Sequence, residues 1–375
     1  MRIMQNEHIT YMELALAEAR KGLGRTTPNP AVGAVIVKDG EVVGRGYHKK
    51  AGTPHAEVNA LANAGHRAAG ATLYVTLEPC NHTGRTPPCT QAILRSGITR
   101  VVIGMADPNP QVAGGGAQYL AAQGIDVHSG VLEQQCRELN HPFIKHSATG
   151  LPWVLMKAGL SLDGKITFRH RQREAITGFE SGRYVHRLRN QVDAILVGVE
   201  TAIIDDPSLT TRLEGVAETR DPLRIVLDTS LRLPPEARML NQTSTAETWI
   251  FCGADADRER EIRLTGRGAK VCRVPADAAG RVNLPAALAL LGSRNITSLL
   301  VEGGACVHGA FYSQRLVDEV ALLYAPIIIG DSGTPLVHGC RWENGRGIPV
   351  LHDVSLQKLG NDILVRALVD GNVLS

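Results

Sequence analysis

Residues with the chemistry of a metal site lie within one stretch of the chain, from His55 to Cys89. One imidazole nitrogen and the thiols of Cys80 and Cys89 are ligands that Zn²⁺ prefers in proteins. Three protein ligands leave the fourth tetrahedral position open for water, which is typical of a catalytic zinc site rather than a structural one. Glu57, two residues after the histidine, adds a carboxylate that can transfer protons beside the metal without binding it.

The order of these residues indicates a class of chemistry. An H-x-E motif followed by Pro-Cys and a second cysteine is typical of zinc-dependent deaminases that act on nucleobases and related rings. Two other interpretations stay open from these residues. The first is that the motif is a chance HxE accompanied by two buried cysteines. The second is that the zinc is merely structural, in a chain whose second half carries the activity. Glu57 at this offset favours the catalytic interpretation.

His55 and Glu57 can share one site only at the start of a helix, because residues two apart on a regular helix point to roughly opposite sides. Pro54 and the run AEVNALANA predict a helix that begins there. Cys89 follows two prolines and precedes TQAILRSG, which predicts a second helix start. The partial positive charge at a helix N-terminus stabilises a thiolate, and this favours metal binding.

Composition limits the possible functions of the whole chain. A length of 375 residues predicts two domains, and 43% hydrophobic with 21% charged residues is typical of a soluble globular protein. A net charge of +3 and 4% aromatic residues argue against a nucleic-acid surface. No run of eighteen apolar residues exists, and the N-terminal segment has no apolar core of a signal peptide, so we expect no membrane association. Seven scattered cysteines favour a reducing cytoplasm.

Strands and helices alternate through the first half of the chain after an N-terminal helix and a β-hairpin. AVGAVIV, Asp39-Gly40 and EVVGRGYH predict the hairpin with a tight turn. We expect helices at 55–64, 89–96, 115–123 and 131–139 and strands at 71–77, 100–105 and 125–130. This order predicts a mixed sheet covered by helices, an α/β layered domain, with the metal cluster where strand ends meet helix starts.

A polar segment at 141–153 predicts a domain boundary near residue 147, which gives domains 1–147 and 148–375. The second domain again has an α/β pattern, with a turn at 203–212. We expect helices at 181–192, 285–292 and 304–315 and strands at 153–167, 194–199, 222–230, 247–253, 269–275, 296–304, 319–330 and 362–369. VEGGACVHGAF at 301–311 predicts a strand, a glycine turn and a helix whose backbone amides could approach a phosphate, although a close turn alone explains the two glycines equally well.

These motifs together resemble the bifunctional riboflavin-biosynthesis deaminase/reductase family along nearly the full length of the chain. TTPNPAVGAVIV, HAEVNAL and PCNHTGRTPPC lie in the first half, and KAGLSLDGKI, GVETAIIDDPSLTTR and VEGG follow in the family's order. Eight residues separate Cys80 from Cys89. Cytidine, tRNA-adenosine and nucleic-acid cytosine deaminases place two there, so the insert makes the resemblance specific.

The resemblance implies two folds and two consecutive reactions. A cytidine-deaminase-like three-layer domain would bind one zinc ion and deaminate 2,5-diamino-6-ribosylamino-4(3H)-pyrimidinone 5′-phosphate. A dihydrofolate-reductase-like domain would then reduce the ribosyl chain with NADPH, giving 5-amino-6-(5-phospho-D-ribitylamino)uracil. It implies no nucleic-acid or membrane partner, and we expect a homo-oligomer.

The resemblance also assigns site residues by position. His55, Cys80 and Cys89 match the zinc ligands, and Glu57 matches the proton-transferring carboxylate. Substrate positions correspond to Asn29, His48, His82, Arg85, Asn109, Lys157, Arg173, Arg189, Ser208, Arg212 and Glu302. Cofactor positions correspond to Gly159, Ala175, Thr201, Asp205, Thr229, Gly304, Ala305, Cys306, Val307, His308, Gly309 and Ala310. Arg189 and Arg212 suit a phosphate clamp, because a guanidinium fork matches phosphate oxygens.

One position departs from the family pattern. Several relatives carry an aromatic residue before the IT of ITG, whereas this chain has Ala175, which removes any stacking on the nicotinamide from that position. A rival hypothesis, a nucleic-acid base deaminase with an accessory binding domain, would require a basic groove and aromatic platforms that the composition does not supply.

Overall fold

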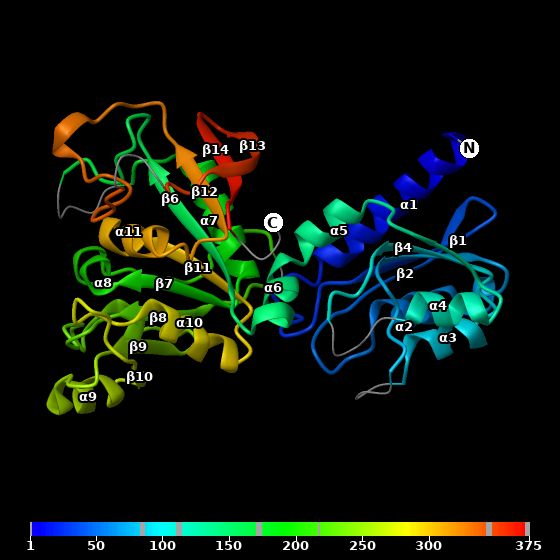
Figure 1. Cartoon of the computed structure of the whole chain (residues 1–375), viewed down its shortest axis with the longest axis horizontal. Coiled ribbons are helices and arrows are strands. Elements are labelled where there is room, and N and C mark those ends of the chain that lie inside the picture. Colours follow the sequence, from blue (N-terminus) through cyan, green and yellow to red (C-terminus); the bar gives the residue numbers. More distant parts are fainter. Residues whose placement is uncertain are drawn as a thin grey trace. The chain divides into compact units, whose positions relative to one another are not determined.

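The computed structural model describes residues 2–82, 87–109, 115–169, 175–216, 218–342 and 347–371 (Figure 1). The chain forms two compact units, Met1–Gly150 and Leu151–Ser375. The predicted boundary near residue 147 falls inside helix α6 (His141–Thr149), the last helix of the first unit. Pro142 at its first turn is compatible with a helix start, which the sequence interpretation overlooked.

The first unit is built on a five-stranded sheet of order β2-β1-β3-β4-β5. Its strands are β1 (Gly33–Lys38), β2 (Glu41–Tyr47), β3 (Thr72–Leu77), β4 (Arg100–Met105) and β5 (Asp126–Ser129). Its helices are α1 (Arg2–Arg20), α2 (Ala56–Ala64), α3 (Cys89–Arg95), α4 (Gly116–Ala122), α5 (Glu133–Leu139) and α6. The predicted hairpin is confirmed, because β1 and β2 pair antiparallel around Asp39 and Gly40 at φ 51° and 80°.

Helices cover both faces of this mixed sheet, as predicted. β1 pairs antiparallel with β3, whereas β3, β4 and β5 run parallel. Figure 1 shows α1 and α5 on one face and α2, α3 and α4 on the other. Helices α2 and α3 both begin at the edge of the sheet where the parallel strands end, so the first turns of these helices face one another.

Two glycines let α2 lie directly on β2. A Cβ atom at Gly46 would lie 2.3 Å from the Ala60 nitrogen and 2.5 Å from the Ala56 carbonyl oxygen. At Gly44 it would lie 2.5 Å from the Ala60 carbonyl oxygen. Backbone atoms cannot yield as a flexible side chain can, so these two positions set the distance between α2 and the sheet. They therefore set the position of His55 at the start of α2.

The second unit has a nine-stranded sheet of order β10-β9-β8-β7-β11-β6-β12-β14-β13. The first seven strands in this order are parallel, and β14 and β13 add antiparallel at one edge. Its strands are β6 (Trp153–Leu160), β7 (Ala194–Gly198), β8 (Leu223–Leu227), β9 (Thr248–Cys252), β10 (Ala269–Arg273), β11 (Ser298–Gly303), β12 (Glu319–Tyr324), β13 (Leu351–Leu359) and β14 (Asp362–Val369). Its helices are α7 (Phe179–Gln191), α8 (Val199–Asp205), α9 (Arg258–Thr265), α10 (Leu284–Ser293) and α11 (Ala305–Ser313).

Two apolar cores lie on opposite faces of this sheet. Side chains of α7, α8 and α9 pack with one set of strand residues, whereas α10 and α11 pack with the other. Val197 and Val226 face the first core, and Leu196 and Ile225 face the second. The alternation follows from the two-residue period of a strand, and burial on both faces explains why these strands read as continuous apolar runs.

Three elements of the second unit were not predicted. The turn expected at 203–212 begins inside α8, whose helix ends only at Asp205, before Pro207. Helix α9 buries one of its residues, Leu264, so its sequence carries no apolar period. Strand β13 lies at the sheet edge with mostly exposed side chains. A periodic apolar pattern appears in a sequence only where one face of an element is buried. These three elements bury few side chains, so the pattern did not predict them.

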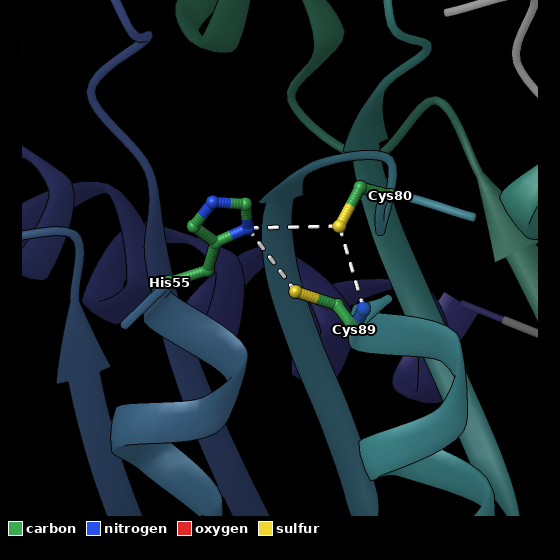
Figure 2. A group of neighbouring side chains, drawn as sticks. All are labelled: His55, Cys80 and Cys89. Atoms are coloured by element: carbon green, nitrogen blue, oxygen red, sulfur yellow. Dashed lines mark hydrogen bonds between the residues drawn. The ribbon is translucent and has the colours of Figure 1, made fainter. Parts of the chain in front are cut away.

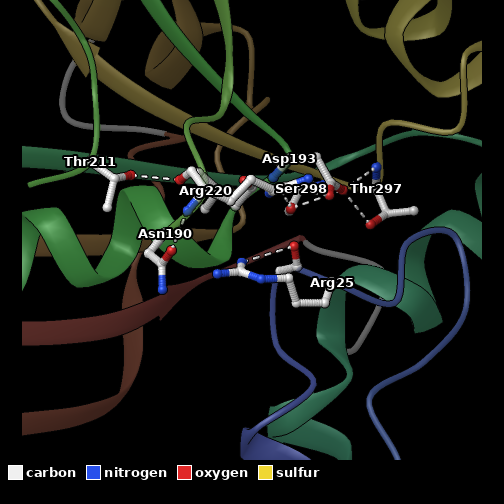
Figure 3. A network of polar contacts seen from close by, with 9 residues as sticks. Arg25, Asn190, Asp193, Thr211, Arg220, Thr297 and Ser298 are labelled. Carbon is white, nitrogen blue, oxygen red and sulfur yellow. Dashed lines mark hydrogen bonds and ion pairs between the residues drawn. The ribbon is translucent and has the colours of Figure 1, made fainter. Parts of the chain in front are cut away.

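A buried carboxylate fastens β7 to β11 at their N-terminal ends (Figure 3). Asp193 is 4% exposed and accepts hydrogen bonds from the backbone and hydroxyl groups of Thr297 and Ser298 at 2.8–3.1 Å. Arg220 pairs with the same carboxylate at 3.5 Å. These contacts fix the register of two central strands at the edge opposite to their carboxyl ends.

Among the described residues, no helix is long and apolar enough to cross a membrane.

We predict that Gly46→Ala destabilises the first unit by about 1–3 kcal/mol, because the added methyl group overlaps α2 backbone. In scanning calorimetry, the transition of the first unit should fall by several degrees, and that of the second unit should stay unchanged. Gly182→Ala is the matched control. It lies in α7, and apart from its chain neighbours and the backbone of its own helix, no atom lies within 4 Å of the added Cβ. This substitution should stabilise the second unit by about 0.5–1 kcal/mol and so raise the temperature of its transition. One shared unfolding transition, shifted by both substitutions, would contradict the expectation that the two units unfold independently.

Candidate active sites

His55, Cys80 and Cys89 converge at the sheet edge where α2 and α3 begin (Figure 2). His55 is the residue immediately before α2, Cys80 follows the end of β3, and Cys89 is the first residue of α3. One ligand atom from each lies within 4.8 Å of the others. The predicted meeting of these three side chains at helix starts is therefore present in the structure.

The three side chains have the spacing of a tetrahedral zinc site. The His55 Nδ1 atom lies 3.3 Å from the Cys89 sulfur and 3.6 Å from the Cys80 sulfur. Bond lengths of about 2.3 Å to sulfur and 2.0–2.1 Å to nitrogen, at a tetrahedral angle, place two such ligands about 3.5 Å apart. The donor set and its geometry both fit Zn²⁺, with Nδ1 as the histidine ligand.

Hydrogen bonds prepare one sulfur for a negative charge. The Cys89 backbone N–H, at the start of α3, donates to the Cys80 sulfur at 3.3 Å. The Cys89 thiol and the His55 ring also interact with this sulfur, and together they lower the pKa of Cys80 to about 4. Cys89 is the proton-bearing partner, so its pKa is raised. A site that stabilises thiolate before metal binding favours a soft divalent cation.

Glu57 lies in the first turn of α2 and is 3% exposed. Its carboxylate interacts with the Cys89 sulfur, so it lies beside the ligand cluster without completing it. Burial raises the pKa of Glu57. A buried carboxylate whose pKa is raised holds a proton more readily, which suits it to accept and return one.

Asn29 and His48 form a support next to this cluster. The Asn29 amide donates to His48 Nε2 at 3.1 Å, and the His48 Nδ1 atom lies 3.2 Å from the Pro54 carbonyl oxygen. The His48 ring meets the His55 ring edge-on at 5.3 Å between centroids. The structure therefore places both predicted substrate residues beside the ligand histidine, with His48 2% exposed.

Glu78 organises the loop on the other side of the cluster, and sequence reasoning missed it. Its carboxylate accepts hydrogen bonds from the backbone of Asp107 at 3.3 Å and of Ala117, in the first turn of α4, at 3.0 Å. The Asn109 N–H donates to the Asp107 carboxylate at 2.9 Å. His82, two residues after Cys80, is exposed. The acidic residue one position before Pro79-Cys80 was the available signal.

In the second unit, three charged residues meet at the carboxyl ends of two neighbouring strands. Arg189 of α7 binds Glu302 of β11 through two hydrogen bonds of 2.7 and 2.8 Å. Lys157 of β6 lies 3.9 Å from the same carboxylate. Burial alone would raise the pKa of Glu302, but Arg189 and Lys157 outweigh it and lower the pKa to about 2. Glu302 is therefore an anion that holds both cations.

Arg212 lies beside this cluster with an exposed side chain. Its backbone N–H donates to the Nδ1 atom of His186, one turn before Arg189 on α7, at 3.1 Å. Burial and the charges of Arg189 and Arg212 lower the pKa of His186 to about 4, so its ring is neutral at physiological pH. His186 was not predicted, because a histidine on an amphipathic helix carries no motif.

The glycine loop before α11 is joined to α8. The Gly304 N–H donates to the Thr201 hydroxyl at 3.1 Å, and Gly303 adopts φ 108°, a conformation that favours glycine. A Cβ atom at Gly198, where β7 ends, would lie 2.8 Å from the Val307 side chain. The predicted cradle of Thr201 and the 304 loop is thus a single connected feature at the strand ends.

The remaining predicted substrate and cofactor residues have different surroundings. Gly159 faces the Thr177 side chain, Asp205 ends α8, and the Thr229 hydroxyl accepts a hydrogen bond from the Val282 backbone at 3.4 Å. Ala175 is exposed, and the Ser208 carbonyl accepts from Gln242 at 2.9 Å. Arg85 and Arg173 lie outside the described residues.

Three residues of the predicted cofactor segment 304–310, Ala305, His308 and Gly309, are buried. Ala305 is 8% exposed and His308 is 1% exposed, and the His308 Nδ1 atom lies 3.3 Å from the Leu336 carbonyl oxygen. A Cβ atom at Gly309 would lie 2.0 Å from the His338 carbonyl oxygen. Cys306 is exposed and Val307 and Ala310 are half-buried. In the structure, His308 and Gly309 have packing contacts of their own.

Comparison with known proteins decides the family. The cytidine and deoxycytidylate deaminase zinc-binding region matches residues 5–105, and the RibD C-terminal domain matches residues 152–365. The riboflavin biosynthesis protein RibD of Bacillus amyloliquefaciens is 43% identical over 359 residues, which cover 96% of this chain and 95% of that protein. Its Escherichia coli counterpart is 42% identical, with 89% and 91% covered. The chain belongs to the RibD family.

Solved structures of RibD proteins confirm the predicted fold class. RibD of Acinetobacter baumannii, form 1, superposes with a TM-score of 0.85 at 34% identity and covers 97% of this chain and 99% of that chain. The deaminase/reductase of Thermotoga maritima gives a TM-score of 0.83 at 34% identity, with 98% and 99% covered. The chain is therefore a bifunctional deaminase/reductase of riboflavin biosynthesis, with a zinc-binding cytidine-deaminase-like domain and a dihydrofolate-reductase-like domain that implies a nicotinamide cofactor.

We predict that Glu78→Ala weakens deamination without removing the metal. Loss of the carboxylate leaves the Asp107 and Ala117 N–H groups without their acceptor, and the loop that carries Asn109 loses its anchor. The substrate KM for ammonia release should rise about tenfold or more, as expected for losing charged hydrogen bonds, while zinc content stays unchanged. Glu41→Gln, at the exposed start of β2, is the control. Loss of zinc in Glu78→Ala would assign Glu78 to the metal site instead.

Proposed function

We propose that the unit Met1–Gly150 hydrolytically deaminates the 2,5-diamino-6-ribosylamino-4(3H)-pyrimidinone 5′-phosphate ring and that the unit Leu151–Ser375 reduces the ribosyl chain with NADPH. The observation that carries the proposal is the cluster of His55, Cys80 and Cys89 with a buried, non-ligating Glu57 beside it. The Thermotoga maritima relative is described as a diaminohydroxyphosphoribosylaminopyrimidine deaminase and 5-amino-6-(5-phosphoribosylamino)uracil reductase, and this supports both substrates.

In the deaminase unit, we assign the three clustered side chains to one zinc ion per chain. When bound, zinc supplies Lewis-acid chemistry that lowers the pKa of a water molecule. Glu57 accepts a proton from the attacking water and returns it to the amine that leaves, so one carboxylate serves both halves of the step. A C–O bond forms, the C–N bond breaks, and ammonia is the product.

The surrounding residues hold the ring. Asn29 and His48 lie against the ligand histidine, and we assign them to the pyrimidine together with Asn109. His82 is exposed at the edge of the same site, and we assign it and Arg85 to the substrate phosphate. The support for Asn29 and His48 is their hydrogen bond to one another and the edge-on contact of the His48 ring with His55.

We predict that Glu57→Gln abolishes ammonia release by several orders of magnitude while zinc stays bound. The amide keeps the shape of the side chain but cannot carry the proton. Metal analysis and an ammonia assay measure the two effects separately, and reduction of the already deaminated substrate with NADPH provides the internal control.

Two outcomes would overturn this assignment. Substantial deamination by Glu57→Gln would place the proton transfer on another group. Loss of zinc from Glu57→Gln, with zinc retained in Cys89→Ser, would mean that the ligand set is different from the one proposed.

In the reductase unit, hydride can reach C1 of the ribosyl group only after its ring opens to an aldehyde or imine. The enzyme must hold the opened chain and the cofactor in register, which makes the step nearly unimolecular. We assign the cofactor to Gly159, Thr201, Asp205 and the loop from Gly304, and the substrate to the strand ends that carry Lys157 and Glu302. These two groups of residues adjoin one another at the carboxyl ends of β6, β11 and β7.

The two arginines proposed for the substrate phosphate have different surroundings. Arg189 has its Nε and Nη2 atoms committed to Glu302 and its Nη1 atom to the Thr210 carbonyl oxygen at 3.2 Å. Arg212 is exposed. We therefore assign direct phosphate contact chiefly to Arg212 and give Arg189 the role of orienting Glu302.

We predict that Arg212→Ala raises the substrate KM of the reductase about tenfold or more, because it removes a charge-assisted contact to phosphate. Affinity for NADPH should be nearly unchanged, since the contact belongs to one ligand only. Arg187→Ala, an exposed arginine of α7, is the matched control and should leave both constants unchanged. Weak cofactor binding with intact substrate KM would show that Arg212 contacts the cofactor instead.

The remaining assignments are predictions about partners. We propose a small phosphorylated pyrimidine as the ligand, no nucleic acid, a cytoplasmic setting and a homo-oligomer. All seven cysteines are free thiols, which supports a reducing compartment.

A further inference from the structure

A side-chain amide fastens the segment that carries Asn29. Residues 21–32, between α1 and β1, form neither helix nor strand, so no regular element holds the backbone near Asn29. Asn140, between α5 and α6, contacts this segment from 109 residues further along the chain. The Ala31 N–H donates to the Asn140 Oδ1 atom at 2.9 Å, and the Asn140 Nδ2 atom donates to the Ala31 carbonyl oxygen at 3.1 Å. One side chain thus satisfies both backbone groups of a single residue.

These bonds are shielded from water. Asn140 is 3% exposed and Ala31 is 5% exposed. The Asn140 Nδ2 atom also donates to the Cys136 carbonyl oxygen at 3.3 Å, which joins the amide to α5. Buried backbone groups that lose their partners destabilise the conformation in which they are buried. An amide offers N–H donors and an acceptor at once, whereas a carboxylate of the same shape only accepts. The amide at position 140 therefore suits the backbone at Ala31 in a way that a carboxylate does not.

Hydrogen bonds continue from this fastening to the residues proposed to hold the pyrimidine. The Val32 carbonyl oxygen, in the next residue of the segment, accepts from the His48 N–H at 2.9 Å. The Asn29 amide, two residues before the fastening, donates to the His48 Nε2 atom at 3.1 Å. Because a carbonyl oxygen can only accept, the His48 Nδ1 atom carries the hydrogen that faces the Pro54 carbonyl oxygen, and Nε2 is left to accept from Asn29. A displacement of residues 29–32 would therefore disturb both Asn29 and His48.

We infer that Asn140 is a positioning residue of the deaminase, which fixes the backbone of residues 29–32 and so places Asn29 and His48 for the pyrimidine ring. The inference rests on the proposed deamination and extends it to a residue that we assign to neither the substrate nor the metal. None of the three zinc ligands lies on this segment, so zinc binding should not depend on Asn140. Substrate binding should depend on it, because a displacement of about 1 Å in a positioning group can weaken catalysis about a hundredfold.

Two substitutions in the full chain test the inference. In Asn140→Asp the carboxylate can still accept from the Ala31 N–H, but it cannot donate to the Ala31 carbonyl oxygen and repels it. The substrate KM for ammonia release should rise at least about tenfold, with kcat nearly unchanged, as expected when a binding contact is lost. Zinc content and reduction of the already deaminated substrate should stay as in the wild-type chain. Asn140→Ser, which adds no charge and lacks the amide, should raise the KM likewise and serves if Asn140→Asp does not fold.

Ile98→Val is the matched control for general destabilisation. Ile98 is 2% exposed and lies just before β4, at the edge of the sheet opposite to the two helix starts. Loss of a buried methyl group should lower the unfolding temperature of the first unit and leave the substrate KM unchanged. Hydrogen exchange provides a measurement without turnover. Peptides that span residues 26–33 should exchange faster in Asn140→Ser than in the wild-type chain, and at the wild-type rate in Ile98→Val.

A double-mutant cycle tests whether Asn140 acts through Asn29. Asn29→Ala removes the contact itself, so Asn29→Ala/Asn140→Asp should raise the substrate KM by clearly less than the product of the two single effects. Effects that multiply would place the action of Asn140 elsewhere and overturn the inference. An unchanged KM in both Asn140 variants, loss of zinc from them, or an equal rise of KM in Ile98→Val would also overturn it. Absence of ammonia release by the wild-type chain would instead overturn the proposed deamination.

Discussion

The deaminase site depends on two helices that begin at the same place. Each helix start presents unpaired N–H groups and a partial positive charge. One such N–H, from Cys89, donates to the Cys80 sulfur, and His55 is fixed immediately before the other helix. Because thiolates and metal ligands are stabilised there, the backbone itself prepares the cluster. The tight packing of α2 on β2 then determines how far apart the two starts lie, which links the dimensions of the sheet to the distances between the ligands.

The reductase site follows a different principle, in which one buried anion organises several cations. Glu302 holds Arg189 by two hydrogen bonds and has Lys157 nearby. Breaking such a pair leaves an uncompensated buried charge, so each member fixes the rotamer of the others. The strand ends that carry these residues adjoin the glycine loop and α8. The residues that we propose for substrate and cofactor thus form one line along the carboxyl edge of the sheet, and their order in space differs from their order in the sequence.

The sequence predicted what depends on residue type, spacing and local period. The ligand triad, Glu57, the Asp39-Gly40 turn and the alternation of buried strands with helices all carry such a signal, and each is present. The pairing of Arg189 with Glu302 could not be predicted, because 112 residues separate the two positions and only the strand order brings them together. Helix α9 was also not predicted, because it buries a single side chain, that of Leu264. Glu78 acts through two backbone N–H groups, so residue types do not reveal its partners, and its place before Pro79-Cys80 was the one signal available.

The positions of Cys80 and Cys89 have a consequence for how such sites diversify. One cysteine is fixed by the end of β3 and the other by the start of α3, so the segment between them does not set the metal geometry. The entropy of closing a loop grows slowly with its length, so this segment can lengthen at little thermodynamic cost. A two-residue connection and an eight-residue one can therefore share one hydrolytic centre. The inserted residues are free to evolve as an interchangeable specificity element, which adapts old chemistry to a new substrate.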